Sequence, residues 1–208
     1  MQDLWQRPGL SRKDRYIATI ATLVARDQTI GMLHYFNSAL DSGVTPGEIS
    51  EIVTHIAFYA GWSNAFSAVA ILKDIYLERG IGRDQLPEIS PKLLPIADAV
   101  PDEAIRAGFI TENIKPVSEA LQHFTDDLLY HEVWLRPGLA PRDRNLATIT
   151  ALIATSQMAF LPLYLSRAVQ KGVTRDQISE LLAHVAFYAG WPIAISAAGV
   201  VKQFFDAR

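Results

Sequence analysis

The 208-residue sequence contains no cysteine, and this absence excludes a whole class of chemistry. Without a thiol the chain forms no disulfide, thiolate–zinc site or iron–sulfur cluster, and it carries out no thiol-based redox reaction. No stretch approaches the roughly 18 consecutive apolar residues of a membrane-spanning helix. The segment Met1 to Arg7 has no apolar run behind its charges. We therefore expect a cytoplasmic protein with no membrane partner.

Excess charge of either sign is also lacking. The chain has 19 Lys and Arg against 22 Asp and Glu, and no basic stripe, so a nucleic-acid partner is not expected. No histidine pair has the spacing of a metal site, and no glycine-rich phosphate loop or Gly-x-Ser-x-Gly turn occurs, so no metal is expected. Half of the residues are hydrophobic, which is enough for a substantial core.

The chain is an internal duplication. The string Trp5-Gln-Arg-Pro-Gly-Leu10 returns as Trp134-Leu-Arg-Pro-Gly-Leu139, and the same shift of 129 positions holds without a gap to the end. His55-Ile-Ala-Phe-Tyr-Ala-Gly-Trp62 likewise returns as His184-Val-Ala-Phe-Tyr-Ala-Gly-Trp191. We predict a first module over residues 1–80, a connector over 81–132 and a second module over 133–208. The connector is proline-rich at first and is predicted to be helical after Pro101.

Each module is predicted to be a set of helices joined by short turns, so the fold class is all-α. Thr45 and Thr174 each begin a capping box, and Gly43, Gly61 and Gly190 stand where helices should end. The segment from Tyr16 to Ala25 is apolar on most faces, which places it at the centre. No convincing period-2 pattern of a strand occurs.

Two groups of side chains recur in both modules and are candidates for catalysis or ligand binding. The first is a carboxylate and an imidazole one helical turn apart, followed by a tyrosine: Glu51, His55 and Tyr59, repeated as Glu180, His184 and Tyr188. A carboxylate in this position orients a histidine for general acid or base catalysis. The alternative is a histidine that is satisfied within the core or an interface.

The second group consists of arginines, which bind carboxylates by paired hydrogen bonds: Arg7, Arg15, Arg136 and Arg144. Their alternative is a buried ion pair with Asp14, Asp143, Glu51 or Glu180. Four aromatic residues are candidates for the wall of a pocket, or alternatively fill the core: Tyr35, Tyr164, Trp62 and Trp191.

The repeated strings resemble the carboxymuconolactone decarboxylase family, within the alkylhydroperoxidase D-like superfamily of helical proteins. The resemblance is carried by Val133-Trp-Leu-Arg-Pro-Gly-Leu139, Arg142-Asp-Arg144, Gly172-Val-Thr174 and Leu182-Ala-His-Val-Ala-Phe-Tyr-Ala-Gly190. It implies two tandem multihelical modules of this superfamily. The peroxidase branch uses a Cys-x-x-Cys motif, whose positions hold Gln28 and Gly31, or Gln157 and Phe160, so thiol peroxidase activity is excluded. Tyr35 and Tyr164 stand where a motif histidine is found in many family members.

The resemblance implies cofactor-free decarboxylation of a carboxylated lactone, such as 4-carboxymuconolactone, in aromatic-compound catabolism. Such a site binds carboxylates, stabilises a dienolate oxyanion and returns a proton to carbon. We expect His55 and His184 to deliver the proton, and Arg15 and Arg144 to act beside them. The expected substrate-binding residues are Arg7, Arg136, Tyr35, Tyr164, Trp62, Trp191, Glu51 and Glu180.

Two other functions stay open: a diverged family member that binds or transforms another small organic acid, and a non-catalytic helical assembly. Family members form rings of modules, so the resemblance also implies a homo-oligomer in which three chains make a six-module ring. The repeat positions Tyr16 and Asn145, and His34 and Leu163, differ. Any two sites are therefore expected to be non-equivalent.

Overall fold

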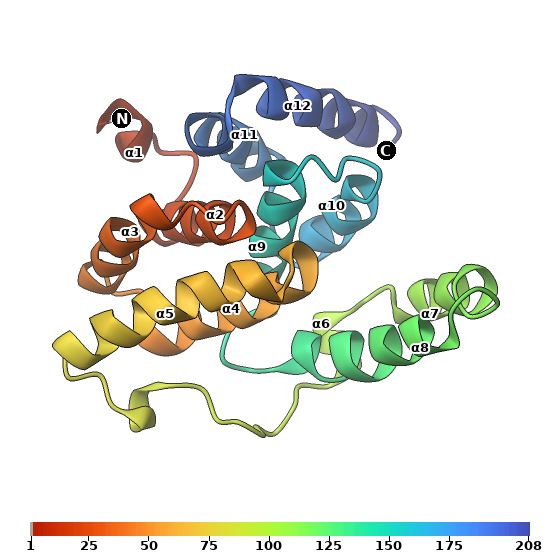
Figure 1. Ribbon diagram of the computed structural model, residues 1–208. Helices are drawn as coiled ribbons and strands as arrows, with labels where there is room; N and C mark the ends of the chain where they lie inside the picture. The colour runs from red at the N-terminus through yellow and green to blue at the C-terminus, as the bar shows by residue number, and fades with distance from the viewer. Residues whose placement is uncertain (1) are drawn as a thin grey trace.

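The computed structural model describes residues 2–208, and this part of the chain contains helices and no strand (Figure 1). The all-α prediction is confirmed. The first module consists of α1 (Gln2–Gln6), α2 (Arg12–Ala25), α3 (Thr29–Asp41), α4 (Pro46–Ala60) and α5 (Trp62–Glu78). The second consists of the 3-10 turn η3 (Val133–Leu135), α9 (Pro141–Ala154), α10 (Leu161–Gln170), α11 (Arg175–Ala189) and α12 (Trp191–Asp206).

The helix ends follow the capping signals in the sequence. The hydroxyls of Thr45 and Thr174 accept hydrogen bonds from the backbone three residues on, and both capping boxes are complete. Helices α4 and α11 end at Gly61 and Gly190, which have φ angles of 93° and 102°. Glycine adopts this left-handed backbone without the steric cost that a Cβ imposes.

Helices α2 and α9 pack against each other at the centre of the molecule (Figure 1). Every residue of α2 from Asp14 to Ala25 is buried, as expected for a helix that is apolar on most faces. The modules also interlock, because α4 packs on both α2 and α9, while α11 packs on both α9 and α2. Each central helix therefore contacts a helix of the other module, and this contact builds the sites described below.

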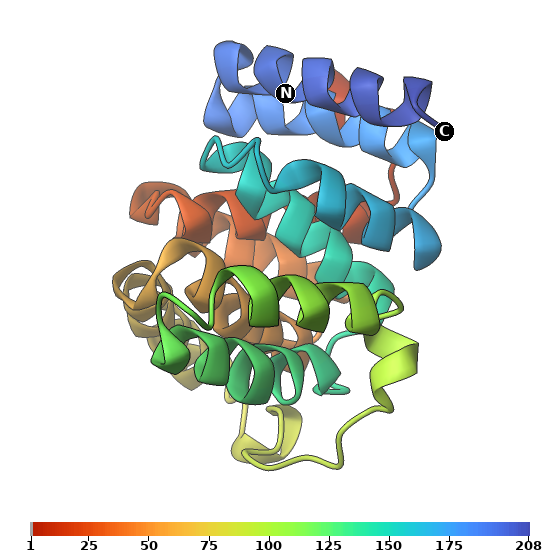
Figure 2. The same cartoon turned by 90° about the vertical axis from the view of Figure 1, so that its right-hand side faces the viewer.

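The connector between the modules starts as extended chain along one edge of the molecule (Figure 1). It contains the 3-10 turn η1 (Arg83–Gln85), α6 (Ile96–Ala99), α7 (Glu103–Asn113), α8 (Glu119–His123) and the π-helix η2 (Phe124–Tyr130). Helices α7 and α8 form an antiparallel pair that is visible in both ribbon views (Figures 1 and 2). The predicted helical period across Ile114 and Val117 is interrupted by a turn, because Pro116 cannot continue the hydrogen bonding of α7.

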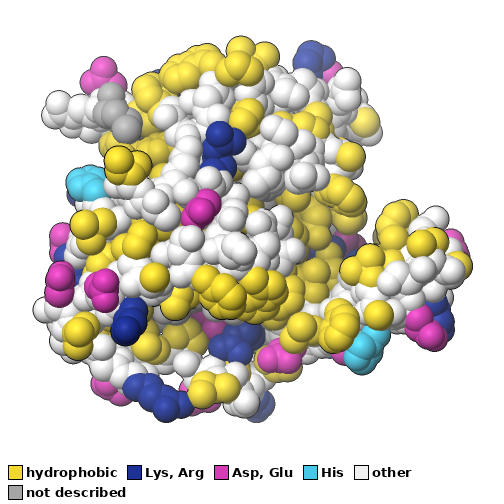
Figure 3. Space-filling view, viewed as in Figure 1, with side chains coloured by type: hydrophobic (Ala, Val, Ile, Leu, Met, Phe, Trp, Pro, Cys, Tyr) yellow, Lys and Arg dark blue, Asp and Glu magenta, His cyan; other side chains and the backbone are white. Residues whose placement is uncertain are grey.

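No helix within residues 2–208 is both long and apolar enough to cross a membrane. Large hydrophobic side chains do reach the surface on α5 and α12 (Figure 3). Trp62 and Phe66 on α5 are 52% and 63% exposed, and Trp191 and Ile195 on α12 are 54% and 66% exposed.

Candidate active sites

The arginines of the first module face the carboxylate and the histidine of the second module. Arg15 on α2 reaches Glu180 on α11, with Nη2 at 3.5 Å from Oε2, and its Nη1 lies 3.4 Å from Nδ1 of His184. Arg7, in the Arg-Pro-Gly turn before α2, donates from Nε to Glu180 at 2.8 Å. The face of α11 that carries Glu180 and His184 is thus contacted by two arginines of the first module.

The reciprocal network forms between the second module's arginines and the first module. Arg144 on α9 donates from Nη2 to Glu51 on α4 at 2.9 Å, and its Nη1 lies 3.4 Å from Nδ1 of His55. Arg136 donates from Nε to the other oxygen of Glu51 at 2.8 Å. All four predicted arginines therefore form ion pairs with the two predicted glutamates, so the ion-pair alternative left open by the sequence describes their state in this structure.

The Arg-Pro-Gly turns contribute to these networks in two ways, through a backbone acceptor and through the space left by a glycine. The carbonyl oxygens of Arg7 and Arg136 accept hydrogen bonds from Arg15 and Arg144, at 2.7 and 2.9 Å. A Cβ at Gly138 would lie 2.8 Å from Cγ of Glu51. The glycine is needed because the glutamate side chain passes directly over the turn.

Both histidines are buried and neutral. Burial, with the nearby charge of Arg15, lowers the pKa of His184 to about 3, and burial lowers the pKa of His55 well below its ordinary value. Nε2 of His55 lies 2.7 Å from the hydroxyl of Thr148, which itself donates to the carbonyl of Arg144. Nε2 of His55 is therefore the donor, and Nδ1 is the acceptor that faces the guanidinium.

Beside the network of Arg15 and His184, aromatic side chains of both modules form a chain of hydrogen bonds. The ring of Trp5 lies edge-on to His184 at 5.4 Å, and its indole N–H donates to Tyr188 at 3.1 Å. The Tyr188 hydroxyl donates in turn to Tyr35 on α3 at 3.0 Å. This Trp–Tyr–Tyr relay uses the hydrogens of Trp5 and Tyr188, and the hydroxyl hydrogen of Tyr35 is left for another acceptor.

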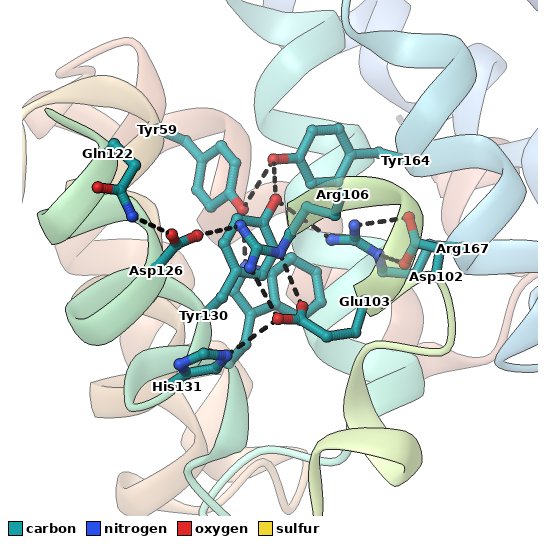
Figure 4. Close-up of polar contacts among 11 residues, drawn as sticks. Tyr59, Asp102, Glu103, Arg106, Gln122, Asp126, Tyr130, His131, Tyr164 and Arg167 are labelled. Carbon is teal, nitrogen blue, oxygen red and sulfur yellow. Dashed lines mark hydrogen bonds and ion pairs between the residues drawn. The ribbon is translucent and has the colours of Figure 1, made fainter. Parts of the chain in front are cut away.

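An equivalent relay, also built from both modules, lies beside the network of Arg144 and His55. The indole N–H of Trp134 donates to Tyr59 at 2.9 Å, and Tyr59 donates to Tyr164 on α10 at 3.3 Å. Here the relay continues, because the hydroxyl of Tyr164 lies 2.9 Å from that of Tyr130, at the end of the π-helix (Figure 4). The connector thus closes over the second site with side chains that the first module does not have at the repeat positions.

A cavity lies at the outer end of each relay. The first has a volume of about 520 Å³, and its lining includes Trp5, Arg12, Tyr16, His34, Tyr35 and Ser38. Among residues 2–208, neither Arg12 nor His34 has a hydrogen-bond or ion-pair partner. Both of these side chains are exposed and available to a ligand.

The second cavity has a volume of about 450 Å³ and lies between α7, the π-helix and α10. Its lining includes Tyr130, Tyr164 and Leu163, which replaces His34 of the first module. Proline 141 stands where the first module has Arg12. The second cavity therefore lacks both of the unpaired basic groups of the first.

The structure divides the sequence-predicted residues into three sets. Tyr35 and Tyr164 line the two cavities. The glutamates, histidines and arginines form two networks, the first buried and the second partly open at the exposed Arg7: Glu51, His55, Arg136 and Arg144 in the first, and Arg7, Arg15, Glu180 and His184 in the second. Trp62 and Trp191 pack on Phe58 and Phe187 at the surface and line neither cavity.

Sequence reasoning did not select Trp5, Trp134, Arg12 or Tyr130 as site residues. The tryptophans were detectable, since both copies of the Arg-Pro-Gly motif carry one. Arg12 occurs only in the first copy and Tyr130 lies in the connector, and only the positions of the cavities identify them. No cluster of His, Asp and Glu within the described part of the chain has the arrangement of a metal site.

Comparison with known proteins finds one family in two segments of the chain. The model of the carboxymuconolactone decarboxylase family matches residues 1–74 and 119–203. The 4-carboxymuconolactone decarboxylase of Acinetobacter baylyi is 34% identical over 94 residues, which are 45% of this chain and 70% of that protein. A nitrosuccinic acid decarboxylase of Metarhizium robertsii is 32% identical over 91 residues, which are 44% of this chain and 64% of that protein. The duplicated chain belongs to the carboxymuconolactone decarboxylase family.

Proposed function

We propose that this chain is a cofactor-free decarboxylase of a small unsaturated organic acid such as 4-carboxymuconolactone, and that the first cavity is its active site. The observation that carries the proposal is the presence, in one cavity of about 520 Å³, of the unpaired Arg12 and His34 beside the free hydroxyl hydrogen of Tyr35. The family membership and the two decarboxylase relatives support this reaction class.

These three side chains match the needs of the reaction. Arg12 binds a carboxylate that the product retains. When the carbon–carbon bond to the leaving carboxylate breaks, carbon dioxide departs and the electron pair moves through the double bond to the lactone carbonyl. Tyr35 donates a hydrogen bond to the oxyanion that develops there. His34 then returns a proton from solvent to carbon, and this completes the reaction.

We assign positioning roles to the buried histidines and arginines. His184 contacts the ring of Trp5, and Trp5 holds Tyr188, which donates to Tyr35. The network of Arg15 and His184 thus fixes the direction of the Tyr35 hydroxyl from behind. A neutral, fully buried histidine is poorly placed to exchange protons with solvent, which is why we give proton delivery to His34.

The test is a spectrophotometric assay of 4-carboxymuconolactone turnover by the wild type and by single variants. Arg12→Gln should raise KM, and Tyr35→Phe should lower kcat by roughly 100-fold, as expected when an oxyanion donor is lost. His34→Gln should lower kcat without the fall in stability expected of His184→Gln. Tyr164→Phe is the matched control in the second module and should retain most of the activity.

Other outcomes would move the assignment. Full activity of Tyr35→Phe together with loss in Tyr164→Phe would place the reaction in the second cavity. Loss of kcat in a well-folded His184→Gln variant, with His34→Gln active, would return proton delivery to the buried histidine. An inactive wild type that binds small organic acids in calorimetry would favour the diverged binding protein.

We also propose that copies of the chain associate, with three chains making a ring of six modules. Exposed aromatic and aliphatic side chains on α5 and α12 support association, since large exposed apolar surfaces are typical of protein interfaces. Light scattering coupled to gel filtration should give the mass of a trimer. A monomer at micromolar concentration would rule this assembly out.

A further inference from the structure

The second cavity differs from the first in the character of its walls. It is enclosed mainly by aliphatic and aromatic side chains from three elements: Ile105, Phe109 and Ile110 of α7, Leu129 of the π-helix, and Phe160 and Leu163 at the start of α10. Figure 3 shows hydrophobic side chains on both sides of the recess between the α7–α8 pair and the rest of the molecule. Its volume of about 450 Å³ falls within the range of small-molecule sites.

The arginines near this cavity are already neutralised. Arg106 binds Glu103 at 2.7 Å and Asp126 at 2.7 Å, and Arg167 binds Asp102 through two hydrogen bonds of 2.7 and 2.8 Å (Figure 4). Three carboxylates therefore surround two guanidinium groups. An anionic ligand would find no free cation among these groups, in contrast to the first cavity with Arg12.

The inner end of the cavity holds a hydrogen-bond donor that lacks a protein acceptor. Three hydroxyls, those of Tyr59, Tyr164 and Tyr130, meet in two contacts of 3.3 and 2.9 Å (Figure 4). Two contacts use two of the three hydroxyl hydrogens. The remaining neighbours, Trp134 and Arg167, only donate, so they cannot accept the third hydrogen.

The third hydrogen belongs to a tyrosine that lines the cavity. Because Tyr59 donates to Tyr164, it belongs to Tyr130 or Tyr164, and both residues line the cavity. Both are also buried, with exposed fractions of 3% and 7%. A buried donor without an acceptor is costly, and a ligand oxygen would remove this cost. Tyr130 is held here by a π-helix, a rare distortion that is frequent at functional sites.

We propose that the second cavity is a binding site for a neutral, largely apolar molecule with one hydrogen-bond acceptor, such as an aromatic ketone or ester. The apolar walls take the ring, and the tyrosine hydroxyl donates to the acceptor oxygen. The site is separate from the proposed active site, and the proposal does not depend on the chain being a decarboxylase. In this duplicated chain, one cavity binds an acid and the other binds a neutral ligand.

The test uses two probes that share a ring and differ in charge, 2-acetylnaphthalene and 2-naphthoate, with isothermal titration calorimetry of the full chain. We expect the ketone to bind with a stoichiometry of one and the carboxylate to bind at this site at least tenfold more weakly. The hydroxyl that carries the third hydrogen is removed by Tyr130→Phe or by Tyr164→Phe, and one of these two variants should weaken ketone binding roughly three- to tenfold, the effect of one hydrogen bond. Tyr35→Phe removes the matching hydroxyl of the first cavity and should leave the ketone affinity unchanged.

Two cavity-filling variants locate the bound ketone. Ala159→Trp and Leu163→Trp each add bulk at the exposed rim of the cavity, where the cost to folding is smallest, and each should reduce ketone affinity at least tenfold. Equal ketone affinity in the wild type and in a folded filling variant would overturn the proposal. Equal affinity for both probes would overturn the preference for a neutral ligand. Failure of the wild type to bind the ketone, with a sedimentation coefficient that falls in Leu163→Trp, would assign the recess to a second copy of the chain instead.

Discussion

Glu51 of the first module and Arg144 of the second form an ion pair at 2.9 Å from which water is excluded, their side chains being 1% and 0% exposed. The repeat equivalent, Glu180 with Arg15, is longer at 3.5 Å, and Glu180 is 14% exposed. The duplication has therefore produced one closed network and one network that is partly open. We therefore expect the two networks to contribute unequally to the stability of the protein.

The two glutamates should differ in how much stability they contribute. Glu51→Gln leaves the guanidinium of Arg144 without a counter-charge in the interior, and it should lower the free energy of unfolding by about 3 kcal/mol. Glu180→Gln should cost less, about 1 kcal/mol, since water reaches that carboxylate, its contact with the buried Arg15 is longer at 3.5 Å, and its other partner Arg7 is exposed. Urea unfolding at neutral pH measures both values. Equal losses in the two variants would contradict the difference in burial.

Stability should fall as the solution is acidified from pH 7 to pH 5. His184 has a pKa lowered to about 3 by burial, and the pKa of His55 is also lowered, so the unfolded chain binds more protons than the folded chain below about pH 6.5. The stabilising effect of neutral histidine is complete above that pH and is lost below it, at up to about 1.4 kcal/mol per pH unit for each histidine. Urea unfolding at several pH values measures this slope. His184→Gln should remove about half of this slope, and an unchanged slope would show that His184 binds protons equally well in the folded and the unfolded chain.

Two glycines should respond to alanine in opposite directions. At Gly138 a Cβ would meet Cγ of Glu51 at 2.8 Å, so Gly138→Ala should destabilise the protein by about 2 kcal/mol. At Gly108, in the interior of α7, a Cβ meets no atom within 4 Å. Gly108→Ala should therefore stabilise the protein by about 0.5 to 1 kcal/mol. Thermal unfolding followed by circular dichroism compares the two, and a stabilising Gly138→Ala would show that Glu51 can move away from the turn.

Neither half of the chain should fold by itself. Residues 1–80 contain Glu51 and His55 without Arg144, and α2 would lose its contacts with α9. We expect this fragment to show no cooperative urea transition, whereas co-expression with residues 81–208 should restore one. A cooperative transition in the isolated fragment, with the helix content of the intact module, would show that the cross-module contacts are dispensable.

The helices could be predicted from the sequence because their signals are local. The hydroxyls of Thr45 and Thr174 and the glycines Gly61 and Gly190 act on residues within one turn, and the ends of α4 and α11 lie where these signals place them. The turn after α7 also has a local signal, Pro116. The apolar residues around Ile114 nevertheless predict a continuous helix there, because they recur with a helical period.

The composition of the sites could be predicted only in part. Helical spacing placed Glu51 and His55 on one face of a helix, but periodicity does not say which element packs on that face. The partner, Arg144, comes from the other copy, 89 residues from His55 in sequence. The second cavity depends on α7 and the π-helix, which have no repeat counterpart, so the duplication gave no sign of it. Whether His55 and His184 act in catalysis stays a prediction.

The exchange of partners between the modules also bears on how such a chain originates. A protein made of a single copy would carry an arginine and a glutamate that only a second molecule satisfies, and dilution would separate them. Fusion keeps the two copies at a high effective concentration whatever the abundance of the protein. Fusion also allows the two networks to differ in sequence, because a substitution in one half alters one network, whereas in two identical copies it would alter both. Tyr16 and Asn145, or Ser38 and Arg167, are then free to differ, and one gene can encode two unlike pockets.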